Sequence, residues 1–331
     1  ATSVATLLFL PSEIHGKKFF YISPTDRLGY TAFEAFGGSA LFGLANTEVE
    51  GTDVLPAFRL GYANSGFGVA LDLSLSRDWS SNKSINSDTR TTYLGDNIGL
   101  SFSMPLGSDT FYARARWLSY YSQASETGNT EFSDDYSVKN AVAGLTGTSG
   151  SLTYDAYFGA IREGHTYEVD GNKAVDEDTY LGLALGFDLG YAALQSSNAR
   201  VLVGLNNQIG MLFYDEVKKI KKAGNNIGVL ISPNILGEVV FRDNWLAFAG
   251  ATHSLFFAII NQDGDNNTSY TMLTQDPRRI DGSATDPRTD AFVGVRYEKT
   301  NWALEAQVSA NPFTALGGQN IFANFGGFIY F

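Results

Sequence analysis

The chain has 331 residues, of which 44% are hydrophobic and 14% aromatic, and its formal net charge is −12 at pH 7. That negative balance argues against nucleic acid as a partner, since nothing basic could follow a phosphate backbone. The absence of Cys excludes a disulfide framework and any thiolate metal site. Apolar runs are too short for a spanning helix, which needs about 18 residues or more, whereas many Gly, Tyr and Phe residues favour strands and tight turns.

Residues 1–35 do not alternate between apolar and polar positions. Pro11, Gly16 and Pro24 interrupt this stretch, and no charged leader with an apolar core stands ahead of it. We therefore expect a mature chain whose secretion signal has been removed. We predict that residues 1–35 form a separate segment, either a periplasmic extension or a plug, and that one β-domain occupies residues 36–331.

From Phe36 onward, alternating residues predict successive β-strands. In the segment 66–78 every second residue is large and apolar, and the residues between them are small or polar. Each such segment is close to the length of about ten residues that a tilted strand needs to cross a bilayer. We predict about fourteen strands, near 36–46, 53–63, 66–78, 94–105, 109–122, 137–147, 151–162, 178–192, 199–214, 226–241, 245–260, 289–299, 301–310 and 320–331.

The connections between these segments alternate in length. Tight connections fall at 64–65, 106–108, 148–150, 242–244 and 300, and long polar ones at 79–93, 123–136, 163–177, 215–225 and 261–288. A transmembrane barrel has short periplasmic turns and long external loops, whereas a soluble sandwich has no physical reason to place its long loops at one end. The pattern predicts an all-β fold, a single transmembrane antiparallel up-and-down β-barrel.

In such a barrel the apolar rows face lipid and the alternate rows face the lumen. An Arg or Lys turned toward the bilayer midplane costs about 2–4 kcal/mol, so charged residues should turn inward. Asn207 and the stretch 252–254 depart from the alternation, and we expect a β-bulge at either place. The predicted lumen-lining residues are Arg59, Asp72, Arg114, Arg116, Asp155, Asp188, Glu238, Arg296, Glu298 and Glu305.

The last strand, residues 320–331, carries no charge and ends the chain on an aromatic residue. A polar residue, a Gly and two apolar residues occupy its positions Asn324, Gly326, Ile329 and Phe331. This ending resembles the C-terminal assembly signal of bacterial outer-membrane β-barrels. The resemblance implies an outer-membrane location with the C-terminus in the periplasm. It also implies recognition by the barrel assembly machinery and contact with membrane lipid and lipopolysaccharide.

Catalytic and metal-binding patterns are weak. His253 and Ser254 are adjacent in a strand and should point to opposite faces, so they cannot share a site without a bulge. Asp134–Asp135 has no His near it in sequence. The acidic stretch 263–267 lacks the Gly and Glu of a calcium loop, and Asp276-Pro-Arg and Asp286-Pro-Arg indicate turns. We predict no catalytic residue, no metal, no cofactor and no enzymatic activity.

The remaining candidate is the lumen. Mixed Arg and Asp/Glu rows along a water-filled bore predict a channel or porin for passive or substrate-selective diffusion of small solutes. The alternative is a barrel scaffold that docks other proteins through loops 123–136, 163–177 and 261–288. The basic cluster Lys218–Lys222 would meet anionic lipopolysaccharide or form a solvated loop tip.

Overall fold

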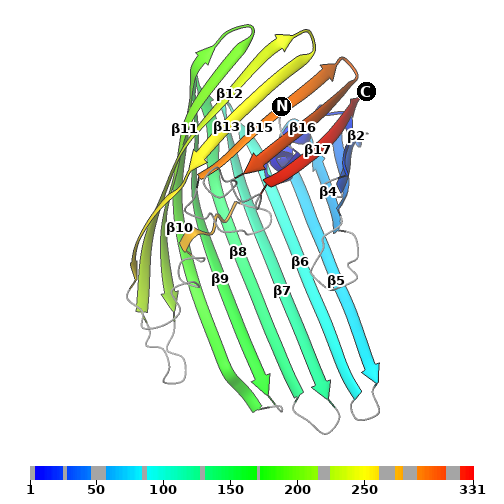
Figure 1. Cartoon of the computed structure of the whole chain (residues 1–331), viewed down its shortest axis with the longest axis vertical. Coiled ribbons are helices and arrows are strands. Elements are labelled where there is room, and N and C mark those ends of the chain that lie inside the picture. The colour runs from blue at the N-terminus through cyan, green and yellow to red at the C-terminus, as the bar shows by residue number, and fades with distance from the viewer. Residues whose placement is uncertain are drawn as a thin grey trace.

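A computed structural model describes most of the chain, namely residues 4–24, 28–45, 57–83, 88–126, 131–169, 172–214, 224–260, 273–278, 289–310 and 321–331. Apart from the short helices α1 (Val4–Phe9) and η1 (Pro11–Ile14), nearly all of these residues belong to one antiparallel sheet (Figure 1). None of the helices in the described part of the chain has the length and apolar character needed to span a membrane.

The described residues form seventeen strands. They are β1 (Phe19–Ser23), β2 (Leu28–Ala35), β3 (Gly38–Ala45), β4 (Ala57–Ala63), β5 (Gly68–Lys83), β6 (Asp88–Leu106), β7 (Asp109–Glu126), β8 (Glu131–Ser149), β9 (Leu152–Val169), β10 (Asn172–Gln195), β11 (Ala199–Tyr214), β12 (Gly224–Arg242), β13 (Trp245–His253), β14 (Leu255–Ile260), β15 (Thr289–Lys299), β16 (Trp302–Ala310) and β17 (Ile321–Tyr330). Because β1 pairs with both β2 and β17, the sheet closes on itself as a barrel.

β13 and β14 together form one barrel strand. β12 pairs with both in a continuous register, with Asn234 opposite Thr252 and Ile231 opposite Leu255. The interruption at Ser254 lies near Pro233 of β12, which has no N–H to donate to the ladder. The bulge predicted at 252–254 is therefore wrong, and so is the one at Asn207, where the β10–β11 register is also unbroken.

Counted this way, the described residues contain sixteen barrel strands, two more than the predicted fourteen. The two additional strands are β1 and β2, which lie within residues 1–35, ahead of the predicted boundary at residue 36. Their inward side chains are apolar as well, since Phe19, Tyr30 and Ala32 are buried in one cluster with Leu7 and Leu8 of α1. Apolar side chains on both faces remove the alternation on which the prediction depended.

Three of the predicted long loops are continuations of strands. β5 and β6 extend into 79–93, β7 and β8 into 123–136, and β9 and β10 into 163–177. Both faces of these extensions are polar in sequence, because beyond the bilayer both faces meet water. Periodicity therefore gives no strand signal there, although backbone pairing continues.

The barrel is consequently much taller on one side (Figure 1). β8 has 19 residues, which at about 3.4 Å per residue and about 40° of tilt rise roughly 50 Å. β16 has 9 residues and rises roughly 23 Å, close to the apolar band of about 25 Å in such barrels. We call β5–β10 the tall wall; about half of its height lies beyond the band.

The outer surface carries the large apolar side chains. Leu185 is 59% exposed, Phe158 53% and Ile259 66%, and they lie on the rows that point away from the interior. Near the tight turns, three aromatic rings of β13, β15 and β16 form a row, with ring centroids 4.9 Å apart for Trp245 and Tyr297 and 5.2 Å apart for Tyr297 and Trp302. Exposed apolar side chains of this number are stable only in lipid.

Candidate functional site

The inner wall carries the ten charged residues that the sequence assigns to the lumen. On β4 and β5, Arg59 and Asp72 are directly opposite, and the Arg59 Nε lies 3.2 Å from the Asp72 Oδ1. The Arg59 guanidinium also donates to the Tyr30 hydroxyl. On β7, Arg114 and Arg116 are both buried.

The Arg116 Nε donates to the Asn97 Oδ1 at 2.8 Å. A second set of ion pairs lies closer to the tight turns. The Arg200 Nε is 3.2 Å from the Glu238 carboxylate. Arg296 lies 3.0 Å from Glu298 and 3.7 Å from Glu305. Most of these pairs join opposite charges on neighbouring strands, and Arg296 and Glu298 belong to the same strand, β15. The interior here therefore carries paired charge rather than a field of one sign.

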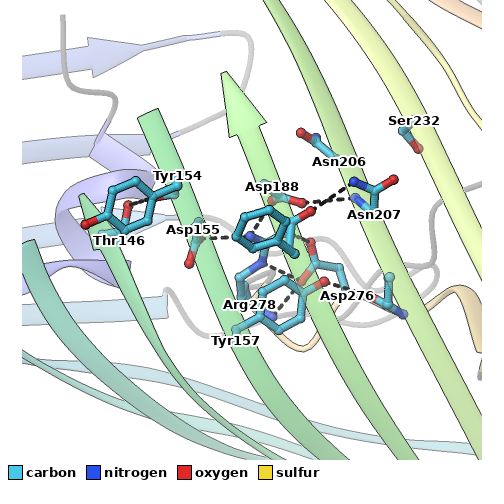
Figure 2. A network of polar contacts seen from close by, with 12 residues as sticks. Thr146, Tyr154, Asp155, Tyr157, Asp188, Asn206, Asn207, Ser232, Asp276 and Arg278 are labelled. Atoms are coloured by element: carbon cyan, nitrogen blue, oxygen red, sulfur yellow. Dashed lines mark hydrogen bonds and ion pairs between the residues drawn. The ribbon is translucent and has the colours of Figure 1, made fainter. Parts of the chain in front are cut away.

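Asp155 of β9 and Asp188 of β10 have a partner that sequence periodicity does not identify. Arg278, from the connection between β14 and β15, places its Nη1 2.9 Å from the Asp155 Oδ2 and 2.6 Å from the Asp188 Oδ2 (Figure 2). Its Nη2 lies 2.9 Å from the Asp276 carboxylate. The guanidinium carbon stands 3.9 Å from the centroid of the Tyr157 ring, a cation–π contact.

This arrangement holds a segment of the long connection, residues 273–278, against the inner wall. The Gln208 Nε2 donates to the Leu273 carbonyl at 3.2 Å and to the Gln275 carbonyl at 3.1 Å. Leu273 is buried among Ile161, Leu212 and other apolar side chains. We call residues 273–278 the inward segment.

Two glycines of the wall lie directly beneath the inward segment, where a larger side chain would collide with it. A Cβ at Gly159 would lie 2.4 Å from the Pro277 Cγ, and one at Gly210 would lie 2.9 Å from the Leu273 carbonyl oxygen. Real Cβ atoms do not approach neighbours so closely, so the wall is shaped to admit this backbone.

The Arg278 guanidinium is a fixed charge. Burial by itself lowers its pKa, but the carboxylates of Asp276 and Asp188 and the Tyr157 ring act in the other direction, and the net pKa is raised. Arginine therefore stays protonated here at any physiological pH. The inward segment contributes a permanent positive charge to a wall that presents two carboxylates.

The first residues of the chain also lie inside the barrel, behind β15–β17 in the view of Figure 1. η1 contacts β3–β6, and Ile14 is fully buried. The Ser12 N–H donates to the Ser103 Oγ at 2.7 Å, and the Ser103 hydroxyl donates to the Ser12 Oγ at 2.8 Å. Phe9 packs on Tyr112 with centroids 4.6 Å apart. Residues 4–16 therefore pack against the inner wall of the barrel.

A cavity of about 470 Å³ remains between these features and the tight turns. It lies along β8–β12, and its lining combines apolar surface with polar side chains, among them Tyr154, Asp155, Asp188, Arg200, Asn206 and Asn234. A volume of this size accommodates a small solute with its polar groups in contact with the wall.

Arg278 and Gln208 are functional candidates that sequence reasoning missed. Gln208 lies on an inward row beside small residues, and Asp276-Pro-Arg indicates only a turn. Nothing local in the sequence indicates that this turn enters the barrel. The two aspartates, in contrast, were found because they occupy inward positions of well-patterned strands.

The histidine candidates are resolved differently. His165 of β9 and Asp134 of β8 come together, with Nε2 and Oδ1 2.7 Å apart, although they are distant in sequence. Ser254 is buried and bonds to the Ser232 Oγ at 2.9 Å, whereas the exposed His253 contacts the Thr289 Oγ1 at 2.7 Å. His253 and Ser254 thus point to opposite faces, as expected. Lys218–Lys222 and the acidic stretch 263–267 lie outside the described residues.

The C-terminal strand closes the barrel between β16 and β1. Gly326 leaves space for the Tyr21 ring, whose hydroxyl would be 2.7 Å from a Cβ there. Ile329 and Phe331 are exposed on the outer surface, and Asn324 stands opposite Gln307 of β16. Of the motif residues, Gly326 is buried and the other three are exposed.

A closed up-and-down antiparallel barrel with tight turns at one rim, an apolar outer surface and charged inner rows is the architecture of outer-membrane β-barrels. The chain has the fold of an outer-membrane β-barrel protein.

No protein-family model and no curated protein matches the sequence. Among solved structures, it is similar to the copper transporter OprC, with 10% identity, a TM-score of 0.47, and coverage of 88% of this chain and 52% of that one. It is also similar to the ferric preacinetobactin receptor BauA from Acinetobacter baumannii, with 10% identity, a TM-score of 0.47, and coverage of 89% of this chain and 54% of that one. The toluene transporter TodX from Pseudomonas putida shares 10% identity with a TM-score of 0.40, and the match covers 98% of this chain and 90% of that one. The chain spans about half the length of the first two.

Proposed function

We propose that this barrel is a substrate-selective channel for small polar or charged solutes. The observation that supports the proposal most directly is the cavity of about 470 Å³ on the inner wall, with the charged side chains Asp155, Asp188 and Arg200 in its lining. A barrel that served only as a rigid scaffold would gain more from a dry apolar interior, because buried ion pairs contribute little net stability.

The distribution of charge gives the channel its selectivity. Arg114 and Arg116 of β7 lie on the same wall as the carboxylates Asp155 of β9 and Asp188 of β10, so a polar solute along this wall meets a local field that orients it. Counter-charges already paired within the wall, such as Arg59 with Asp72, contribute less to that field.

The two segments inside the barrel make the passage narrow. Residues 4–16 occupy the side formed by β3–β6, and the inward segment occupies the side formed by β9–β12. A sixteen-stranded barrel is wide enough for an aqueous pore when it is empty. We infer that these segments convert a wide bore into a selective one.

Planar-bilayer recording tests this proposal. Purified protein should give ion conductance, and the double variant Arg114→Glu/Arg116→Glu should change its cation-to-anion permeability ratio. Lys299→Glu is the matched control, because it reverses a charge that is exposed at the tight-turn rim. A barrel that inserts into the bilayer and remains electrically silent would contradict the channel.

A second candidate, a docking scaffold, is favoured by the tall wall. About half of the height of β5–β10 lies beyond the apolar band, and a channel does not need a one-sided wall of this height. A scaffold should co-purify with a protein partner in mild detergent and lose that partner when the 123–136 hairpin is shortened. A monomer without any partner would count against this candidate.

A further inference from the structure

Two carboxylates of the wall converge on one nitrogen of Arg278 from separate strands. Their Oδ2 atoms lie 2.9 Å (Asp155) and 2.6 Å (Asp188) from the same Nη1, and the Tyr157 ring lies against the flat face of the guanidinium. Stacking on an aromatic ring is a feature that distinguishes guanidinium recognition from the binding of a compact ammonium ion. The bidentate contact of Arg278 is made by Asp276 of its own segment, through Nε and Nη2.

The barrel holds these carboxylates in place without help from the inward segment. The Tyr112 hydroxyl donates to the Asp155 Oδ1 at 2.6 Å, and the Asn207 N–H donates to the Asp188 Oδ1 at 3.2 Å. Each Oδ1 is therefore held by a barrel donor, while each Oδ2 is directed to the shared nitrogen. The site is preorganised, which reduces the ordering cost of binding.

The same two carboxylates also line the open cavity. A solute in the cavity reaches Asp155 and Asp188 from the side of the tight turns. Asp276, the third carboxylate on Arg278, belongs to the inward segment and would leave with it. The wall would then present two carboxylates and one aromatic face to the solute.

We propose that Asp155, Asp188 and Tyr157 form a guanidinium-binding subsite in the channel, which Arg278 occupies as an internal ligand and which a guanidinium-bearing solute takes in its place. The inference rests on the proposed channel function and specifies its substrate class. Competition with Arg278 makes entry selective, because only a cation of matching shape replaces the contacts that the arginine gives up.

The test uses the full chain in detergent with the Arg278→Ala variant and methylguanidine as the probe. A ligand that binds only the folded state raises the thermal unfolding midpoint in a concentration-dependent way. We expect methylguanidine to bind this variant and to raise its midpoint, with methylamine and tetramethylammonium binding at least about tenfold more weakly because they lack the planar face that stacks on the Tyr157 ring. Adding Asp188→Asn should weaken methylguanidine binding by about tenfold or more, since a charge-assisted hydrogen bond is lost.

Arg200→Ala is the matched control, because it removes an arginine from the same cavity that pairs with one carboxylate only. Equal effects of methylguanidine on Arg200→Ala and Arg278→Ala would overturn the proposal. If Arg278→Ala does not fold, Arg278→Gln, which keeps most of the side-chain volume, serves in the same comparison.

Measuring conductance as well as binding distinguishes the guanidinium subsite from the channel function on which it rests. A barrel that conducts but shows no preferential binding of methylguanidine refutes the subsite and leaves the channel standing. A barrel that binds methylguanidine in detergent but never conducts supports the subsite and refutes its role in transport.

Discussion

Gly68 gives the sharpest test of how the first residues occupy the barrel. It lies at the start of β5, where a Cβ would stand 2.2 Å from both the Pro11 carbonyl carbon and the Ser12 nitrogen. Non-bonded heavy atoms prefer separations of about 3.5–4.0 Å. The conflict is with backbone rather than with a flexible side-chain end, so Gly68→Ala should displace η1 by more than 1 Å, on the order of the missing distance.

The contacts at η1 set the size of the effect. The displacement breaks both hydrogen bonds between Ser12 and Ser103, each contributing about 1 kcal/mol, and leaves the buried Ser103 hydroxyl without its partner. A total of about 2–3 kcal/mol corresponds to a change of roughly 30- to 160-fold in the ratio of unplugged to plugged barrels.

Hydrogen–deuterium exchange and planar-bilayer recording measure the outcome. In Gly68→Ala, amides of residues 4–16 should exchange faster and the mean conductance should rise. Gly66→Ala is the control, because a Cβ there meets only the Asn64 Oδ1, at an ordinary 3.5 Å. Wild-type exchange and conductance in Gly68→Ala would refute the placement of η1 against β5.

Three further changes test other parts of the structure. Arg59→Ala leaves Asp72 buried without its ion pair and should lower the free energy of unfolding by about 3–5 kcal/mol; urea titration should show partial recovery in the double variant with Asp72→Ala. Leu185→Arg turns a charge toward lipid and should cost about 2–4 kcal/mol, whereas Asn206→Arg, which points into the cavity of the inner wall, should cost much less. Phe331→Ala should reduce the amount of barrel assembled in cells without changing the unfolding midpoint of the purified protein, because Phe331 is 65% exposed; an equal loss in both assays would argue against a recognition role.

Much of the fold follows from one physical rule, that a strand between lipid and water must alternate. Where that contrast exists, as from Leu181 to Leu189, the strand and its inward aspartate could both be predicted. The alternation is absent in β1, whose inward side packs on α1. It is also absent in the extensions of β5–β10, where both faces are polar. The strands at the start of the chain were missed because both of their faces are apolar. The loops were predicted too long because both faces of the strand extensions are polar.

The candidate site could be predicted only in part. The ten charged positions belong to regular strands, in which successive side chains alternate between the two faces. Their common inward direction therefore follows from their spacing relative to the apolar residues. Their partners do not, because Arg278 reaches Asp155 from 123 residues away and depends on how a long connection folds into the lumen. The proximity of His165 to Asp134 is likewise a consequence of strand register, which single-strand patterns do not specify.

The central claim is that one row of each strand faces lipid and the other faces water, and spin labels on β11 test it directly. The chain has no Cys, so each introduced cysteine is labelled uniquely. In lipid vesicles, labels at Val203, Leu205 and Ile209 should collide with oxygen dissolved in the bilayer, and labels at Leu202 and Asn206 with a water-soluble nickel chelate. The same preference at adjacent positions, or the reverse pattern, would contradict the structure and every function proposed from it.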